Sequence, residues 1–450
     1  MMGQQTAQQN ALFYDFCLEE RIPQNHLLRK INQFLDFDQI RLYLKPFYSH
    51  TGRPSVDPEL MIRMLLVGYC YGIRSERRLC EEVNFNLAYR WFCGLGLEDG
   101  IPNHSTFSKN RLGRFRNADL LRMVFNTVVK KCIEQGLVGG EGFAIDASFV
   151  QANASVKRSI HAPVDWRPAL KQTRAVKEYL DALDEVADLN RPQKRVSTTD
   201  PMSQWTGAKS RADYFYSTNY LIDADHTVIM DVEASPSTNS LEVSTTKTMI
   251  ERVEKNHGIV PNSLMGDAAY GTANNLNYVV NEKKIAPYIP VWEGVKPKNN
   301  IFAKFDFIWD EYKGEYRCPA QKVLSKNHRN YREPKTHITK ANTIIYRSKS
   351  AECKQCSLKQ YCCPKTPSRK ITRSVYESAR DVARQNCLSK EYETKYLAER
   401  KKVEMSFAHM KSHHNFNNLR LRGLKSANDE FLLVATTQNL KKLAMHNSIN

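Results

Sequence analysis

The first regular hydrophobic pattern lies in residues 54–136 and has a helical period. Glu59–Tyr71 carries a dense apolar run, and Ser75 stands where it can cap a second helix. The apolar positions of that second segment recur at four-residue spacing: Leu79, Val83, Leu87 and Trp91. Because this spacing puts side chains on one face of a helix, the pattern predicts a compact all-α unit.

A basic helix is predicted to close this unit. Ser105 is expected to cap a helix over Thr106–Phe115, which carries Arg111 and Arg114. Two short helices around a loop, the second one basic, are typical of a helix-turn-helix. We therefore predict that Arg111 and Arg114 contact DNA, although a solvated basic face would give the same pattern.

From Gly142 onward the pattern changes to short apolar strands interleaved with helices. The predicted strands are Phe143–Val150, Tyr214–Ile222, Thr227–Ala234, Ser263–Met265 and Ile285–Val291. The predicted helices are Pro168–Leu189, Leu241–Asn256, Ala273–Lys283, Lys390–Lys411 and Asp429–Met445. This order predicts an α/β core in which a mixed sheet packs against helices.

The patterns divide the chain into four parts. Residues 1–50 form an N-terminal extension, and residues 51–136 form the helical unit. The α/β core comprises 140–291 and 390–445, and a Cys-rich insertion covers 292–389.

Charge adds the first functional indication. The chain has 66 Lys and Arg against 48 Asp and Glu, a net charge of +18. A polyanionic partner fits this excess, because neutralised phosphates release condensed counterions; a merely basic soluble protein is the alternative. The polar N-terminus and the lack of an apolar run near 20 residues predict a cytoplasmic protein without a membrane segment.

Three acidic residues stand at informative positions. Asp146 lies inside a predicted strand, Asp267 follows another strand, and Glu404 lies on a predicted helix. Taken singly, a strand-end Asp often caps a turn and a helical Glu often pairs with Lys. Together they offer the carboxylate oxygens that Mg²⁺ prefers, and two such ions can activate water and stabilise a leaving oxygen at a phosphodiester.

Four segments carry a family resemblance. They are Gly52–Leu60 running to Asn103–Ser108, Ala144-Ile-Asp146 with Val150-Gln-Ala-Asn153, Gly266-Asp267-Ala-Ala-Tyr270-Gly271, and Arg400–Lys411, which has the pattern Arg-x3-Glu-x6-Lys. In these segments the chain resembles the DDE transposases of bacterial insertion sequences. The family often has Tyr three residues before the Arg, whereas this chain has Leu397 there with Tyr396 beside it.

The resemblance implies an RNase H-like catalytic core in which Asp146, Asp267 and Glu404 hold two Mg²⁺ or Mn²⁺ ions. It implies that the helical unit recognises terminal inverted repeats and that the enzyme cleaves and joins double-stranded DNA, acting as a homodimer in the nucleoid. Cations near the third acidic residue are expected to bind phosphates: Arg400, Lys401, Lys402 and Lys411. A domesticated DNA-binding protein without catalysis, or a nuclease without strand transfer, are the alternatives.

The insertion contains a separate group of cysteines. Cys318, Cys353, Cys356 and Cys362 have spacings that allow a tetrahedral zinc site, which would hold together an insertion with no core of its own. Related transposases carry a similar cysteine pattern. Cys363 is expected to be a spectator, and His328 or His337 is an alternative to one thiolate. Free thiols remain the other interpretation.

Overall fold

The computed structural model describes residues 16–48, 51–52, 55–161, 173–185, 195–207, 212–237, 239–293, 301–326 and 337–446. Contacts divide the chain into two compact units. The first unit comprises 1–139, 147–242 and 404–450, and the second comprises 140–146 and 243–403. This division differs from the predicted one, because elements of the predicted α/β core belong to both units. No helix in the described part of the chain is long and apolar enough to cross a membrane.

The N-terminal part of the first unit is helical, as predicted for residues 51–136, and its helices also extend into the predicted N-terminal extension. Its α-helices are α1 (Leu18–Arg21), α2 (Leu27–Asn32), α3 (Phe37–Leu44), α4 (Pro58–Cys70), α5 (Glu76–Phe85), α6 (Leu87–Phe92), α7 (Ser105–Asn110) and α8 (Leu120–Glu134). Ser75 caps α5 as predicted, since its Oγ accepts from the Arg78 N–H at 3.5 Å. The predicted cap at Ser105 is wrong: Ser105 is the first helical residue, and its N–H donates to Asn103 Oδ1 at 2.9 Å.

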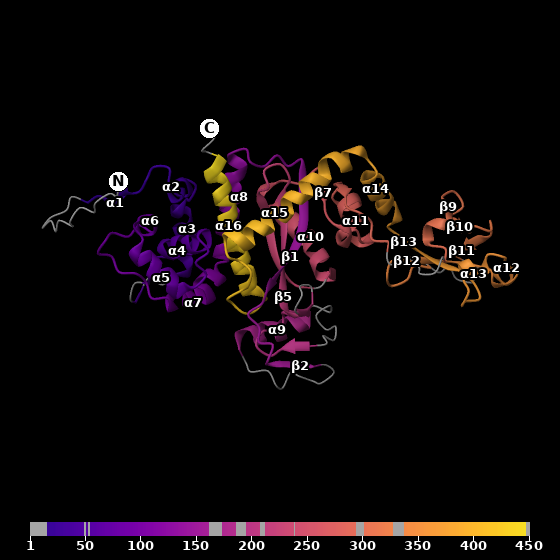
Figure 1. Ribbon diagram of the computed structural model, residues 1–450, viewed down its shortest axis with the longest axis horizontal. Coiled ribbons are helices and arrows are strands. Elements are labelled where there is room, and N and C mark those ends of the chain that lie inside the picture. The colour runs from indigo at the N-terminus through magenta and orange to yellow at the C-terminus, as the bar shows by residue number, and fades with distance from the viewer. Residues whose placement is uncertain are drawn as a thin grey trace, which may run out of the picture. The chain divides into compact units, whose positions relative to one another are not determined.

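The last helix, α16 (Leu424–His446), is the centre of the first unit. It packs against α8, α4 and strand β6 (Ile229–Pro236), and Figure 1 shows it beside α8. Asn439 joins α16 to β6, because its side chain accepts from the Ile229 N–H at 2.9 Å and donates to the Ile229 carbonyl at 2.8 Å. The helix begins five residues before the predicted Asp429, at the point where the Gly423 N–H donates to buried Asp200.

The strands of the first unit form the predicted hairpin. β5 (Asp213–Asp223) pairs antiparallel with β6, and β4 (Gln204–Thr206) pairs antiparallel with β5. Helix α15 (Leu397–His413) packs on β5 through Phe407, whose ring lies 4.7 Å from that of Tyr220. The smaller elements are β2 (Ser159–His161), β3 (Arg195–Ser197) and α9 (Arg174–Glu185), the described part of the predicted helix 168–189.

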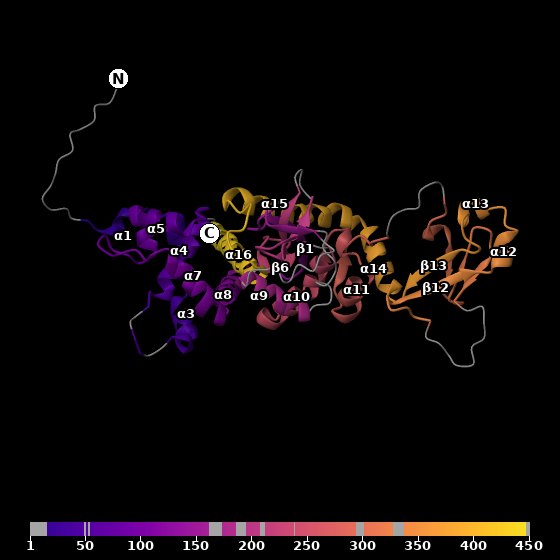
Figure 2. The ribbon, with the colours of Figure 1, turned by 90° about the horizontal axis from the view of Figure 1, so that it is seen from below.

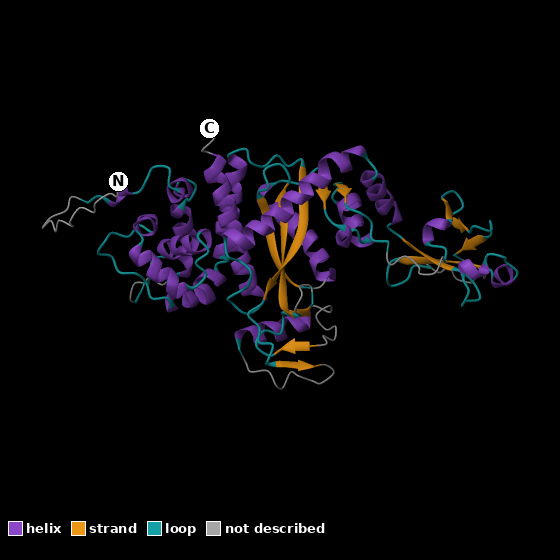
Figure 3. Cartoon of the chain, viewed as in Figure 1, coloured by secondary structure: helices purple, strands orange, loops and turns teal. Residues whose placement is uncertain are grey.

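The second unit contains parallel strands. The first half of β1 (Gly142–Gln151) pairs with β7 (Ser263–Met265), which pairs with β8 (Ala286–Tyr288). Because β1 continues into the first unit, the hydrogen-bonded order is β4-β5-β1-β7-β8, with β6 on β5. Strands are drawn as orange arrows in Figure 3. The helices of this unit include α10 (Asn239–His257), α11 (Ala273–Asn277) and the first part of α15. A further helix, α14 (Glu377–Cys387), lies at the end of the predicted insertion 292–389. The sequence pattern predicts β1, β7, α10 and α15, but not α14. Strand β8 is shorter than the predicted strand 285–291, and α11 ends before the predicted Lys283.

The insertion forms a sheet with its own hydrophobic core. Its strands run in the order β13-β12-β11-β10-β9, and each neighbouring pair is antiparallel. Figure 2 shows β12 and β13 side by side. Its elements are β9 (Ile308–Asp310), β10 (Glu315–Arg317), β11 (Val323–Ser325), β12 (Thr343–Ser348), β13 (Lys370–Ser374), α12 (Ser350–Lys354) and α13 (Lys359–Cys362). Five buried side chains form the core: Phe307, Tyr316, Leu324, Tyr346 and Ile371. The expectation that the insertion has no core of its own is therefore wrong, because aromatic and aliphatic side chains of its sheet pack together.

Candidate active site

Two of the three predicted acidic residues lie at matching positions on adjacent parallel strands. The register pairs Ala144 of β1 with Met265 of β7. One residue further, a Cβ on Gly266 would lie 3.1 Å from Ile145 Cγ2, so the alignment continues past the paired residues. The next residues are Asp146 and Asp267, both half-buried. Since side chains alternate along strands, the two carboxylates are expected on the same face of the sheet.

The turn after β7 fixes the orientation of Asp267. Its Oδ1 accepts from the Ala269 N–H at 2.8 Å, at the start of a single 3₁₀ turn over Ala268–Tyr270. The turn ends at Gly271, where a Cβ would lie 2.0 Å from the Pro290 carbonyl oxygen. Because the clashing atom belongs to the backbone, only glycine fits this position. The Gly-Asp-Ala-Ala-Tyr-Gly sequence is therefore explained by close backbone packing around Asp267.

Glu404 lies on the exposed side of α15. Val403 and Phe407 bury the other side of the helix, at 1% and 5% exposure. Lys411 follows Glu404 by seven residues, which is two helical turns and hence the same face. The Lys411 Nζ donates to Ser148 Oγ at 2.5 Å. Ser148 was not predicted, although its position two residues after Asp146 puts it on the same side of β1.

The other cations of this helix differ in exposure. Arg400 and Lys402 are half-buried, whereas Lys401 is exposed. Tyr396 is buried: its ring stacks on Tyr288 at 3.7 Å between centroids, and its hydroxyl donates to Glu391. Tyr396 therefore packs inside the second unit.

The predicted DNA contact of Arg111 needs correction. Its side chain is 5% exposed and pairs with Glu76 at 2.6 Å, so the guanidinium is not on an open helix surface. The sequence alone could not show that Arg111 is buried in an ion pair and does not lie on a solvent-exposed helix face, because its partner Glu76 is distant in the chain. Arg114 is half-buried, with its guanidinium carbon 4.5 Å from the centroid of the Tyr48 ring.

Only some of the cysteines in the insertion lie close to one another. The thiol of Cys363 interacts with those of Cys353 and Cys362. Burial and then the Cys363 thiol raise the pKa of Cys362 to about 12, and Cys318 also contributes. The contacts thus involve the expected spectator Cys363 in place of Cys356. Of the two alternative histidines, His328 lies outside the described residues and His337 is within them.

Within the described ranges, no group of three or more His, Cys, Asp or Glu side chains is gathered as a site that could hold a metal ion. The zinc site therefore stays a prediction. For the acidic residues, the chemistry of the donors fits a hard cation: all three are carboxylates, and Asp267 is oriented by a backbone N–H.

Two families match this chain. One is described as a transposase domain (DUF772) and matches residues 16–112, which include helices α1 to α7. The other is described as a transposase DDE domain and matches residues 317–444, which include Glu404 and most of the insertion. Asp146 and Asp267 lie outside both matches. Along the chain, the transposase-domain match covers the N-terminal helices, and the DDE-domain match that follows it covers α15 and α16. The chain belongs to the DDE transposases of insertion sequences.

Proposed function

We propose that this transposase binds the terminal inverted repeats of its element, cleaves a DNA strand there and joins the freed end to target DNA. The observation that carries the proposal is the alignment of β1 with β7, which brings Asp146 and Asp267 to matching positions on neighbouring strands. The strand order, with β6-β5-β1 followed by parallel β7 and β8, supports an RNase H-like core.

Asp146, Asp267 and Glu404 are proposed to hold two Mg²⁺ or Mn²⁺ ions. Bound there, the ions would supply an activated water or hydroxyl nucleophile and charge stabilisation of the leaving oxygen. The Asp267 carboxylate is held in one orientation by the Ala269 N–H, so its ligating geometry is set before an ion arrives.

The cations of α15 are proposed to bind phosphates near the cleaved bond. Lys411 is held by Ser148, so its ammonium group is positioned before DNA binds. Arg400, Lys401 and Lys402 add positive charge on the same helix. The pattern of eight Lys and Arg against two Glu in residues 395–425 supports this role.

The helical domain 51–136 is proposed to recognise the terminal repeats, and two copies of the chain to hold the two ends of the element in the nucleoid. The match to a transposase domain over residues 16–112 supports the first of these roles.

Three single substitutions test the site: Asp146→Asn, Asp267→Asn and Glu404→Gln. Each should abolish Mg²⁺- or Mn²⁺-dependent cleavage of terminal-repeat DNA and leave DNA binding intact, because each removes a ligand charge without changing side-chain size. Glu393→Gln, an exposed acid just before α15, is the matched control. Cleavage retained by one variant removes that residue from the site.

A pre-cleaved DNA end distinguishes the two alternatives. Joining of this end to a target plasmid is expected of a transposase. A nuclease would cut terminal-repeat DNA without joining it, and a domesticated DNA-binding protein would do neither.

A further inference from the structure

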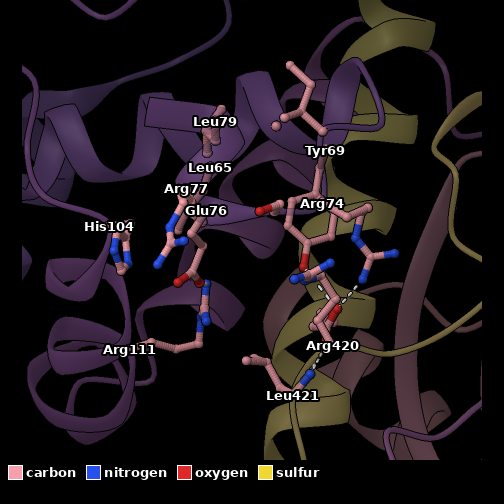
Figure 4. Close-up of a pocket in the computed structure, with 14 residues that line it drawn as sticks. Leu65, Tyr69, Arg74, Glu76, Arg77, Leu79, His104, Arg111, Arg420 and Leu421 are labelled. Carbon is pink, nitrogen blue, oxygen red and sulfur yellow. Dashed lines mark hydrogen bonds and ion pairs between the residues drawn. The ribbon is translucent and has the colours of Figure 1, made fainter. Parts of the chain in front are cut away.

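The first unit contains a pocket of about 450 Å³ that the proposed catalytic residues do not line. Its walls come from the junction of α4 and α5, from the region of α7, and from residues 420–430. Four arginines line it: Arg74, Arg77, Arg111 and Arg420. Figure 4 shows Arg77, Arg111 and His104 around one end of the pocket, with Arg74 and Arg420 at the other.

Only part of this positive charge is neutralised by the protein. Arg111 pairs with Glu76, and Arg74 pairs with Glu430. Arg77 and Arg420 are exposed, and neither side chain has an ion pair with the described residues. Four arginines against two glutamates leave an excess of two positive charges around the pocket.

The backbone adds to this positive character. Ser75, Glu76 and Arg77, the cap and first two residues of α5, line the pocket. The start of this ten-residue helix presents N–H groups and the positive end of the helix dipole. In addition, the buried Nε atoms of Arg74 and Arg111 have no hydrogen-bond partner in the described structure, so neither guanidinium is saturated by its glutamate.

We propose that this pocket binds a phosphate group of a DNA strand, with Arg77 and Arg420 as its direct ligands. A guanidinium donates two parallel hydrogen bonds to phosphate oxygens, which suits the two arginines without ion pairs. The volume lies in the range of ligand pockets and leaves room for the attached sugar. Apolar side chains such as Leu65 and Leu79 complete the wall. This inference rests on the proposed function for the identity of the polyanion as DNA.

The proposal gives the buried Arg111 a different role from the predicted one. Arg111 lies in the wall of the pocket, where its ion pair with Glu76 holds the first turn of α5. Arg111 is therefore a positioning residue, and the exposed Arg77 beside that turn is the phosphate ligand.

The test compares the double variant Arg77→Ala/Arg420→Ala with Arg78→Ala. Arg78 follows Arg77 on the same helix, pairs with Glu82 and does not line the pocket. Binding of terminal-repeat DNA is measured by fluorescence anisotropy at several salt concentrations, without divalent ions. In the double variant the slope of log K against log salt should be smaller by about 1, because one phosphate contact is lost. Arg78→Ala should keep the wild-type slope; equal slopes in all three proteins would overturn the proposal.

A second measurement uses dAMP as a phosphate probe. We expect dAMP to raise the melting temperature of the wild-type protein and of Arg78→Ala, and to have no effect on the double variant. A dAMP effect with an unchanged DNA slope would assign the pocket to free nucleotides and overturn its assignment to a DNA strand. Because neither measurement requires cleavage, both keep their meaning if the substitutions at Asp146, Asp267 and Glu404 refute the proposed catalytic site.

Discussion

Glu430 offers a sharp test of how the first unit is held together. It is 2% exposed on α16, and its Oε1 accepts from the backbone N–H groups of Arg420 at 2.9 Å and Leu421 at 2.7 Å. Its Oε2 pairs with Arg74, which follows α4, and accepts from the Tyr69 hydroxyl at 3.4 Å. One carboxylate thus joins α16, the end of α4 and the segment before α16.

Glu430→Gln keeps the shape of the side chain and removes its charge. The new amide nitrogen is a donor, so it must face either the Arg74 guanidinium or the two N–H groups. In either orientation buried donors oppose each other, and Arg74, with 7% of its side chain exposed, loses its counter-charge. Breaking such a buried pair costs about 3–5 kcal/mol. This loss corresponds to a fall in Tm of about 6–20 °C.

Thermal and urea unfolding, followed by circular dichroism, measure the loss. Glu82→Gln is the matched control, because the Arg78–Glu82 pair has 68% and 36% of its side chains exposed and should contribute at most about 1 kcal/mol. A double-mutant cycle with Arg74→Met should give a coupling free energy of at least about 1 kcal/mol between Arg74 and Glu430. If Glu430→Gln is no more destabilising than Glu82→Gln, the idea that the Glu430 carboxylate holds α16, the end of α4 and the segment before α16 together is refuted.

Two further substitutions test the second unit. Gly271→Ala should lower the free energy of unfolding by about 1–3 kcal/mol and weaken DNA cleavage, because the added methyl group meets the Pro290 carbonyl and displaces the Asp267 turn; Gly207→Ala, with no atom within 4 Å of the added Cβ, is the control, and equal stability of the two variants would contradict the close packing. For the insertion, zinc content by mass spectrometry should be about one ion per chain. Loss of zinc in Cys356→Ser would support the ligand set predicted from sequence, loss in Cys363→Ser would support the thiol contacts, and a zinc-free wild-type protein would contradict the zinc site.

The sequence predicts a helix or strand well where its hydrophobic residues recur with a single clear spacing. The apolar alternation predicts the hairpin of β5 and β6 to within two residues at each end, and Asp223–His226 forms its turn as expected. The short strand β7 is predicted with its observed ends, because Gly266 and Asp267 mark where pairing stops. These elements are specified by residues close together in the chain.

The errors have a common physical origin in long-range pairing. Arg111 looked like a surface residue because its partner Glu76 lies on another helix. The start of α16 was placed too late, because the capping carboxylate comes from Asp200, more than two hundred residues earlier. Ser148 was missed because its partner Lys411 comes from α15. Each case needs the tertiary fold, which periodicity does not supply.

Strand β1 connects the proposed phosphate ligands of the first unit. Ser148 accepts from Lys411, and Asn153, just beyond the strand, donates to the Arg420 carbonyl at 2.6 Å. These two anchor positions are five residues apart, or about 17 Å along an extended chain. Strand β1 and the residues just after it therefore hold the Lys411 ammonium group and the backbone of Arg420, so the proposed phosphate binding by both residues depends on this part of the chain.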